Sequence, residues 1–255
     1  MPAAAARALA VMNALATSPE GLTTSQLAQR TGIARASLGR LLESLVAGHA
    51  VLVDGEASRY FASLGIWEPA AMLMTELRVR EVAFPYMVEL SRAVQNQVNL
   101  AFPELPDIVY TETVLAVDGR VTSRLLYTRR PALATASGRV AVAFTDDTSM
   151  CRAFSVPLEK TTPSSRTSEP ELREELARIR KAGYATIDRE NDPDVSGIAV
   201  ALFDGSSKAV AALGLSRHGA LDPGFVETAA PRAISFAQRI SAELGYRTGS
   251  VIRLA

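Results

Sequence analysis

Very few side chains in this sequence have the type and spacing that catalysis or metal binding requires. The single cysteine, Cys151, has no histidine near it, and the two histidines, His49 and His218, lie far apart. Nucleophilic catalysis needs a base beside the nucleophile, and a zinc site needs clustered ligands. The nucleophile elbow, the phosphate loop and the Gly-x-Gly-x-x-Gly fingerprint are also absent. We therefore expect no enzyme and no metal or cofactor, with Cys151 a small buried residue and His218 in an exposed loop.

Arginines between residues 119 and 145 give this segment a strong positive charge. It contains five arginines and no acidic residue, whereas the whole chain balances 27 basic against 27 acidic side chains. The segment could hold an anionic ligand, or its arginines could be solvated strand ends and contacts between subunits. We favour the second interpretation for most of them. The five are Arg120, Arg124, Arg129, Arg130 and Arg139.

A second group of polar residues, near the N-terminus, has the chemistry of DNA recognition. Residues 35–47 place leucines on one face of a predicted helix and small or basic side chains on the other. Arginine can contact guanine or phosphate, and small residues allow close approach to the duplex. Hydroxyl residues opening the preceding helix should meet the phosphate backbone, and an arginine in a later strand is a weaker candidate. The candidate DNA contacts are Thr24, Ser25, Arg35, Ser37, Arg40 and Arg59.

Three short helices are predicted to position this face. Apolar residues recur with helical spacing over residues 8–15. In the second helix Thr23 can cap the amide of Gln26, whose side chain can reach back in a capping box, and Gly32 ends the helix after about two turns. Gly48 stops the third helix, where we expect it in the C′ position. Two short helices joined by a glycine turn indicate a helix-turn-helix.

A β-hairpin is predicted directly after the three helices. Residues 51–53 and 59–61 have strand character, and Asp54-Gly55 marks the turn between them. Three helices and a hairpin make a winged helix, whose third helix can lie in the major groove. The alternative is a winged-helix protein-interaction module with a solvated outer face and no sequence-specific DNA binding.

The remaining chain predicts an α+β domain around one mainly antiparallel sheet. Strands mostly follow one another, with helices at the ends of the series. Ser168 should open one helix through a capping box, Pro85 should lie near the first turn of another, and Asp222 should open the last. The predicted strands are 97–102, 108–115 and 121–127, and the predicted helices are 64–80, 84–94, 168–181 and 222–244.

Length and composition fit one large domain or two unequal ones, without a membrane segment. The 255 residues can bury a substantial core without a disulfide or metal, and 48% are hydrophobic. No apolar run reaches the roughly 20 residues that span a bilayer. The first residues lack the basic and long apolar regions of a signal peptide. We expect a cytoplasmic protein with no membrane partner.

Motifs spread along the chain carry a resemblance to a known family. One such motif is the pattern of leucine, glycine and arginine residues over residues 22–45. A second is the segment 129–139, which is similar to the motif R-x-P-L-H-A-T-A-x-G-K. Residues 172–185 match a helix with a glycine-tyrosine entry into a strand, and 199–204 and 211–216 match two closing strands. In order and spacing these motifs resemble the IclR family of bacterial transcriptional regulators. The motif histidine is replaced by leucine here, and its lysine by arginine.

This resemblance implies a domain plan and a set of partners. It implies a winged helix-turn-helix domain over residues 1–62, a linker helix over 63–80 and a GAF-like effector-binding domain over 81–247. The implied partners are double-stranded operator DNA, a small-molecule effector and a second copy of the chain, as a dimer or a dimer of dimers. Both repressors and activators occur in the family, and the resemblance does not choose between them.

The resemblance also implies where the effector binds. In the family, backbone amides at a helix start hold the carboxylate of the ligand, which matches the loop from Thr135 to Gly138. Ser216 matches a pocket serine, while Gly214, Ile187 and Gly197 stand where a serine, an acid and a cysteine are common. Fewer polar groups and more room should favour an aromatic or longer carboxylic acid. The implied effector residues are Leu126, Leu133, Thr135, Ala136, Ser137, Gly138, Ile187, Gly197, Gly214 and Ser216.

Overall fold

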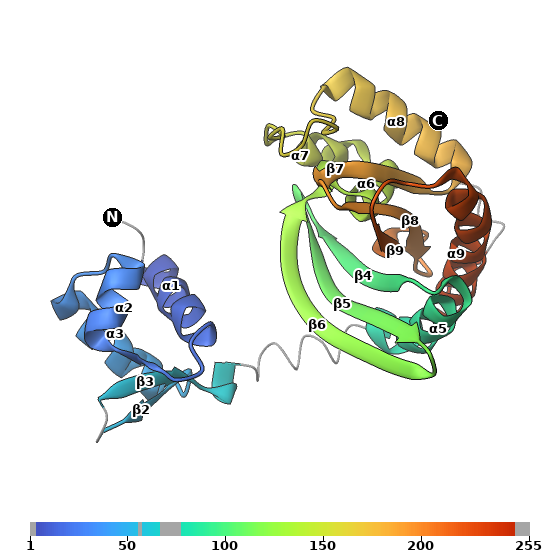
Figure 1. Ribbon diagram of the computed structural model, residues 1–255. Coiled ribbons are helices and arrows are strands. Elements are labelled where there is room, and N and C mark those ends of the chain that lie inside the picture. The colour runs from blue at the N-terminus through green and yellow to red at the C-terminus, as the bar shows by residue number, and fades with distance from the viewer. Residues whose placement is uncertain (1–3, 56–57, 67–77, 248–255) are drawn as a thin grey trace. The chain divides into compact units, whose positions relative to one another are not determined.

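The chain folds into two compact units, residues 1–77 and 78–255. The computed structural model describes residues 4–55, 58–66 and 78–247 (Figure 1). None of the described helices is long and apolar enough to span a membrane. Most of the predicted linker helix lies outside the described residues, and its first part, Leu64–Ile66, is a short 3-10 helix named η1.

The first unit is a winged helix-turn-helix. Its three-stranded sheet has the order β1-β3-β2 with antiparallel pairing. Leucines and valines from all three helices meet in one core, in which Val11, Leu27 and Leu38 have no exposed surface. The elements are α1 (Ala4–Ala16), β1 (Leu22–Thr23), α2 (Thr24–Thr31), α3 (Arg35–Ala47), β2 (Val51–Asp54) and β3 (Arg59–Ala62).

The helix ends of this unit follow the sequence in one case and depart from it in another. The capping box at Thr23 is present, because its hydroxyl accepts the amide of Gln26 and Gln26 Oε1 accepts the amide of Thr23. Gly32 ends α2 with a φ of 68°. Gly48 ends α3, but its φ of −84° is ordinary, and His49 takes the left-handed conformation with a φ of 58°. The expected left-handed turn is therefore displaced by one residue.

The second unit is built on one six-stranded antiparallel sheet of order β6-β5-β4-β9-β8-β7. Two three-stranded halves meet where β4 pairs with β9, and Asn99 lies opposite Gly214 in that central pair. The long strands β4, β5 and β6 curve strongly (Figure 1). The strands are β4 (Gln97–Glu104), β5 (Asp107–Val117), β6 (Arg120–Pro131), β7 (Ala185–Asp192), β8 (Val195–Phe203) and β9 (Ala209–His218).

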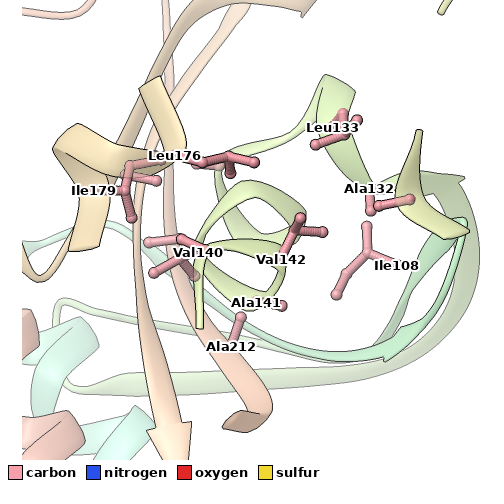
Figure 2. Close-up of a cluster of buried hydrophobic side chains, with 14 of the residues drawn as sticks. Ile108, Ala132, Leu133, Val140, Ala141, Val142, Leu176, Ile179 and Ala212 are labelled. Atoms are coloured by element: carbon pink, nitrogen blue, oxygen red, sulfur yellow. The ribbon is translucent and has the colours of Figure 1, made fainter. Parts of the chain in front are cut away.

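Helices cover both faces of this sheet and bury a separate apolar cluster on each. One cluster packs under the helices of one face, where Val140 of α6 lies close to Leu176 and Ile179 of α8 (Figure 2). The other cluster packs α5 and α9 against the strands through Leu90, Leu213 and their neighbours. The helices are α5 (Arg78–Val94), α6 (Ala136–Ala143), α7 (Asp147–Ala153), α8 (Glu169–Ala182) and α9 (Pro223–Glu243), with the 3-10 helix η2 (Ala132–Ala134) before α6.

Three sequence predictions are wrong at single positions. Pro85 lies inside α5 rather than in its first turn; the helix continues because its apolar face packs on the sheet. Ser168 precedes α8 but makes no side-chain cap, whereas Asp222 does cap α9 by accepting the amide of Phe225. Cys151 is exposed, because α7 buries Met150 and turns the next residue outward. His218 is exposed, as expected, but it is the last residue of strand β9 and does not lie in a loop.

Candidate functional site

A cavity of about 210 Å³ lies in the second unit beside the N-terminus of α6. Strands from both halves of the sheet contribute to it, because β4 and β9 meet at its centre. The helix side of the lining comes from residues 135–137. The strand side comes from Gln97, Asn99, Tyr110, Leu126, Thr128, Arg130, Ile187, Asn191, Asp192, Val195, Ser196, Gly197, Ile198, Gly214, Leu215 and Ser216. A helix start thus faces a curved sheet across a space large enough for a small molecule.

The helix side of the cavity offers two backbone donors that have no partner within the helix. Thr135 is the extended N-cap of α6, and its hydroxyl accepts the amide of Gly138 at 3.0 Å. The amides of Ala136 and Ser137, the first two of the helix, have no acceptor within the helix. Both residues line the cavity. Because a helix N-terminus also carries a partial positive charge, this end of the cavity favours an anion.

Glycines keep this corner of the site tight. A Cβ atom at Gly138 would lie 2.0 Å from the carbonyl oxygen of Ala132, so η2 and α6 pack backbone to backbone. A Cβ atom at Gly214 would lie 2.8 Å from Ser137 Oγ, so this glycine makes room for the serine hydroxyl. Gly197 differs from expectation, because its Cβ would lie 2.8 Å from the carbonyl oxygen of Leu215. The absent side chain there accommodates a neighbouring strand and does not simply enlarge the cavity.

A polar wall faces the helix start across the cavity. Asn99 is 4% exposed and donates from Nδ2 to Ser216 Oγ at 2.7 Å, while Gln97 Nε2 donates to Asn99 Oδ1 at 2.9 Å. Sequence reasoning found Ser216 but missed the two amides. Their signal was available: in the predicted strand 97–102, Val98 and Leu100 alternate with polar residues, which indicates a polar environment on the second face.

Ser196 and Asp188 close the site beside β7. The hydroxyl of Ser196, which lines the cavity, lies 2.9 Å from Asp188 Oδ1 and 2.6 Å from the carbonyl oxygen of Gly219. Asp188 Oδ1 also accepts the amide of Leu221 at 3.0 Å. The Arg189 guanidinium, with these two donors, lowers the pKa of Asp188 to about 2. The carboxylate is therefore ionised at neutral pH and holds Ser196 in place.

Apolar side chains, one arginine and one acidic residue, Asp192, also line the cavity. Ile187 is buried and belongs to the apolar cluster below α6, while Tyr110 and Leu126 come from the curved strands β5 and β6. Thr128 and the exposed Arg130 line the cavity on β6, and Arg130 is its one cationic residue among those described. The cavity therefore combines an anion-binding end with an apolar side.

The arginines of residues 119–145 turn out to have different roles. Arg120 and Arg124 are exposed on β6, and Arg129 pairs with Glu104 at 2.5 Å on the surface. Arg139 is the exception, because it is completely buried in α6 and binds both carboxylate oxygens of Glu190 at 3.1 and 2.6 Å. Arg139 is thus the buried exception to an expectation that concerned most of the five arginines.

The buried pair of Arg139 and Glu190 supports the cavity from beneath. Arg139 Nε also donates to the carbonyl oxygen of Leu133 at 2.7 Å, which fixes the turn before α6. Glu190 precedes Asn191 and Asp192, which line the cavity. The Arg139 guanidinium thus links the start of α6 to strand β7, which also lines the cavity.

The structure brings together eight of the ten residues implied for the effector site. Leu133 lies outside the lining, since it is 1% exposed and packs in the apolar cluster (Figure 2). Gly138 is also outside, because it serves the backbone packing of η2 and α6. The eight that line the cavity are Leu126, Thr135, Ala136, Ser137, Ile187, Gly197, Gly214 and Ser216.

The candidate DNA-contacting residues lie in the first unit on α2, α3 and β3. Arg35 and Arg40 are exposed on α3, opposite the buried Leu38 and Leu42, and Ser37 is half-buried. Ser25 is exposed and Thr24 half-buried in the first turn of α2. The weaker candidate, Arg59, donates to the carbonyl oxygens of Glu20 and Gly21 at 3.1 and 2.8 Å, so its guanidinium is anchored within the unit.

Comparison with known families decides the identity of the fold and its class of function. Residues 71–221 match the family model of the bacterial transcriptional regulator IclR C-terminal domain, and residues 4–54 match the IclR helix-turn-helix domain. The chain belongs to the IclR family of transcriptional regulators. The "Pca regulon regulatory protein" of Pseudomonas putida is 30% identical over 220 residues, which cover 84% of this chain and 73% of that protein.

Solved structures of IclR proteins share the fold. The Thermotoga maritima IclR matches with a TM-score of 0.76 at 23% identity, covering 94% of this chain and 98% of that one. An IclR homolog from Microbacterium hydrocarbonoxydans, complexed with 4-hydroxybenzoate, matches with a TM-score of 0.78 at 23% identity, covering 95% and 99%. This IclR protein is thus a DNA-binding transcriptional regulator with a ligand-binding C-terminal domain, and not an enzyme.

Proposed function

We propose that this IclR protein regulates a catabolic operon in response to a small carboxylic acid, preferably aromatic, bound in the cavity beside α6. One observation carries the proposal: Ala136 and Ser137, whose amides have no partner within the helix, begin α6 at one end of a cavity whose side is apolar. A carboxylate suits the end of the cavity at the start of α6, because anions are stabilised at helix N-termini. An aromatic ring suits the apolar side of the cavity, where Tyr110, Leu126 and Ile187 provide apolar surface.

The size of the cavity supports a compact effector. Its volume of about 210 Å³ is below the roughly 300–1,000 Å³ of cavities that hold drug-sized ligands. A single aromatic ring with a carboxylate would fill it better than an oxoacid of two or three carbons, which would leave apolar surface in contact with trapped water. The 4-hydroxybenzoate complex of the IclR homolog from Microbacterium hydrocarbonoxydans supports the same class of ligand.

For the DNA-binding unit we propose that α3 enters the major groove of a palindromic operator. Arg35, Ser37 and Arg40 would contact base edges or phosphates, and Thr24 and Ser25 would contact the phosphate backbone. Arg59 contributes less, because its guanidinium is already bound to backbone carbonyl groups. Two copies of the chain would present two recognition helices to the two half-sites.

Regulation follows from unequal affinity of the effector for two arrangements of this dimer. A ligand that binds both arrangements equally shifts nothing, however tightly it binds. The chain passes from the winged helix to the second unit through residues 67–77, so a change in the second unit would reach the recognition helices along this segment. The account holds for a repressor and for an activator.

Isothermal titration with four acids tests the effector class. We expect benzoate and 4-hydroxybenzoate to bind the protein more tightly than glyoxylate and pyruvate do. Tighter binding of glyoxylate or pyruvate than of either aromatic acid would overturn the size argument. If the protein instead shows no sequence preference among the promoter fragments tested, the result would support the alternative of a winged-helix interaction module.

A further inference from the structure

A second cavity, larger than the first, lies at the other end of β8. Its volume is about 430 Å³, and it lies between the end of β8, the C-terminal half of α9 and the ends of α6 and α8. The two cavities share no lining residue. A ligand in one would therefore make no direct contact with a ligand in the other.

The second cavity exists because β8 is longer than its neighbour. The pairing of β7 with β8 ends at Ala185 and Ala199, whereas β8 continues to Phe203. Along the last four residues of β8 no described strand occupies this edge. The Phe203 amide donates instead to Ser241 Oγ of α9 at 3.0 Å. Small residues on the facing side of α9, such as Ala237 and Ala242, leave the remaining space open.

Aromatic rings form one wall of this second cavity. Phe203 meets Phe144 edge to face, with ring centroids 5.3 Å apart, and stacks on Tyr246 at 5.1 Å with an interplanar angle of 27°. Ile234 adds aliphatic surface. Such a wall binds a flat or extended apolar group by burial of its surface.

Arg180 gives the second cavity its charge. It is the one charged residue among the described lining residues, and its Nε donates to the carbonyl oxygen of Ala143 at the end of α6. Within the described part of the chain, no acceptor is recorded for its two terminal nitrogens. Two terminal nitrogens in a fixed plane suit a carboxylate, which can accept from both.

We propose that the second cavity is a separate binding site for an apolar carboxylate larger than the effector of the first, such as a two-ring aryl or medium-chain alkyl acid. The carboxylate pairs with Arg180, and the apolar body lies against Phe203, Phe144 and Ile234. The greater volume of this cavity determines the size of the ligand, and its single cationic residue determines the charge of the ligand. This site is independent of the effector proposed for the first cavity.

Fluorescence titration with 2-naphthoate tests this site in a protein whose first cavity is blocked. Leu126→Trp fills the first cavity from an exposed strand, and Gln238→Trp fills the second from an exposed position on α9. We expect the Leu126→Trp protein to bind one equivalent of 2-naphthoate. Adding Arg180→Met or Gln238→Trp should weaken this binding by roughly tenfold or more, because a charge-assisted hydrogen bond or the space itself is lost. Neutral 2-naphthalenemethanol should bind the Leu126→Trp protein at least tenfold more weakly.

Each alternative outcome contradicts the proposal. If the Leu126→Trp protein does not bind 2-naphthoate, the second cavity is no ligand site, whatever benzoate does in the wild type. If Arg180→Met leaves the affinity unchanged, the carboxylate does not bind at this arginine. Circular dichroism and thermal unfolding of every variant check that the fold is intact, and both blocking substitutions introduce the same residue, tryptophan.

Discussion

Replacing Ala136 by proline should weaken effector binding without disturbing α6. Ala136 is the first residue of the helix, a position where proline is well tolerated because the lost amide has no intrahelical partner. Thr135 before it is already extended, with φ −129° and ψ 153°, as a residue before proline must be. The substitution removes one of the two amides proposed to hold the carboxylate. A hydrogen bond to a charged group contributes about 1.5–3 kcal/mol, so affinity should fall roughly 10- to 150-fold.

Isothermal titration with 4-hydroxybenzoate measures this effect against two controls. Ala136→Val adds similar bulk to the same position but keeps the amide, so it should weaken binding less. Asp147→Pro places proline at the first residue of α7, after the extended N-cap Asp146, and lies outside the lining of the cavity. It should leave the affinity unchanged. Wild-type affinity in Ala136→Pro, or an equal loss in the valine variant, would refute the role of the amide.

Three further predictions concern other parts of the chain. Arg35→Ala or Arg40→Ala should weaken operator binding in gel-shift titration by about 1–3 kcal/mol if that arginine contacts a base; wild-type binding by both variants would exclude these contacts. Arg139→Met should lower the free energy of unfolding in urea by up to about 3–5 kcal/mol, because the buried Glu190 keeps only the half-exposed Arg166, 3.6 Å away, as a partner, and adding Glu190→Leu should recover part of this loss. Because the pKa of Asp188 is lowered from its ordinary value of 3.8, the ionised carboxylate stabilises the fold at any pH above 3.8. This contribution is lost as the pH falls towards about 2. Urea titrations should therefore show a smaller loss of stability between pH 5 and pH 2 in Asp188→Asn than in the wild type; an equal loss would contradict the shift.

The helices of the first unit and the strands of the second could be predicted from local sequence patterns. The capping box at Thr23 and the glycine after α2 determine short-range geometry, which the sequence contains in full. Pro85 was misplaced because its effect depends on packing: the apolar face of α5 buries enough surface on the sheet to keep the helix continuous around it. Cys151 was misplaced because residue type predicts average burial, not the face of a particular helix.

The candidate site was partly predictable, because its helix start has a local motif while its far wall does not. Thr135 and the residues after it could be identified from their resemblance to the family segment. Asn99 and Gln97 reach the cavity only through the pairing of β4 with β9, which joins residues more than a hundred positions apart. The burial of Arg139 likewise depends on Glu190, which is distant in sequence and reaches it only after β7 is in place.

The central claim is that a carboxylic acid bound beside α6 controls operator binding, and fluorescence anisotropy tests it directly. A labelled operator, selected from a random-sequence library with the full-length protein, is titrated with wild type and with Ala136→Pro, each with and without 4-hydroxybenzoate. The account predicts that the acid changes the operator affinity of the wild type severalfold or more. At the same concentration it should change that of the proline variant much less. An acid that binds the wild type by calorimetry but leaves its operator affinity unchanged would contradict the account.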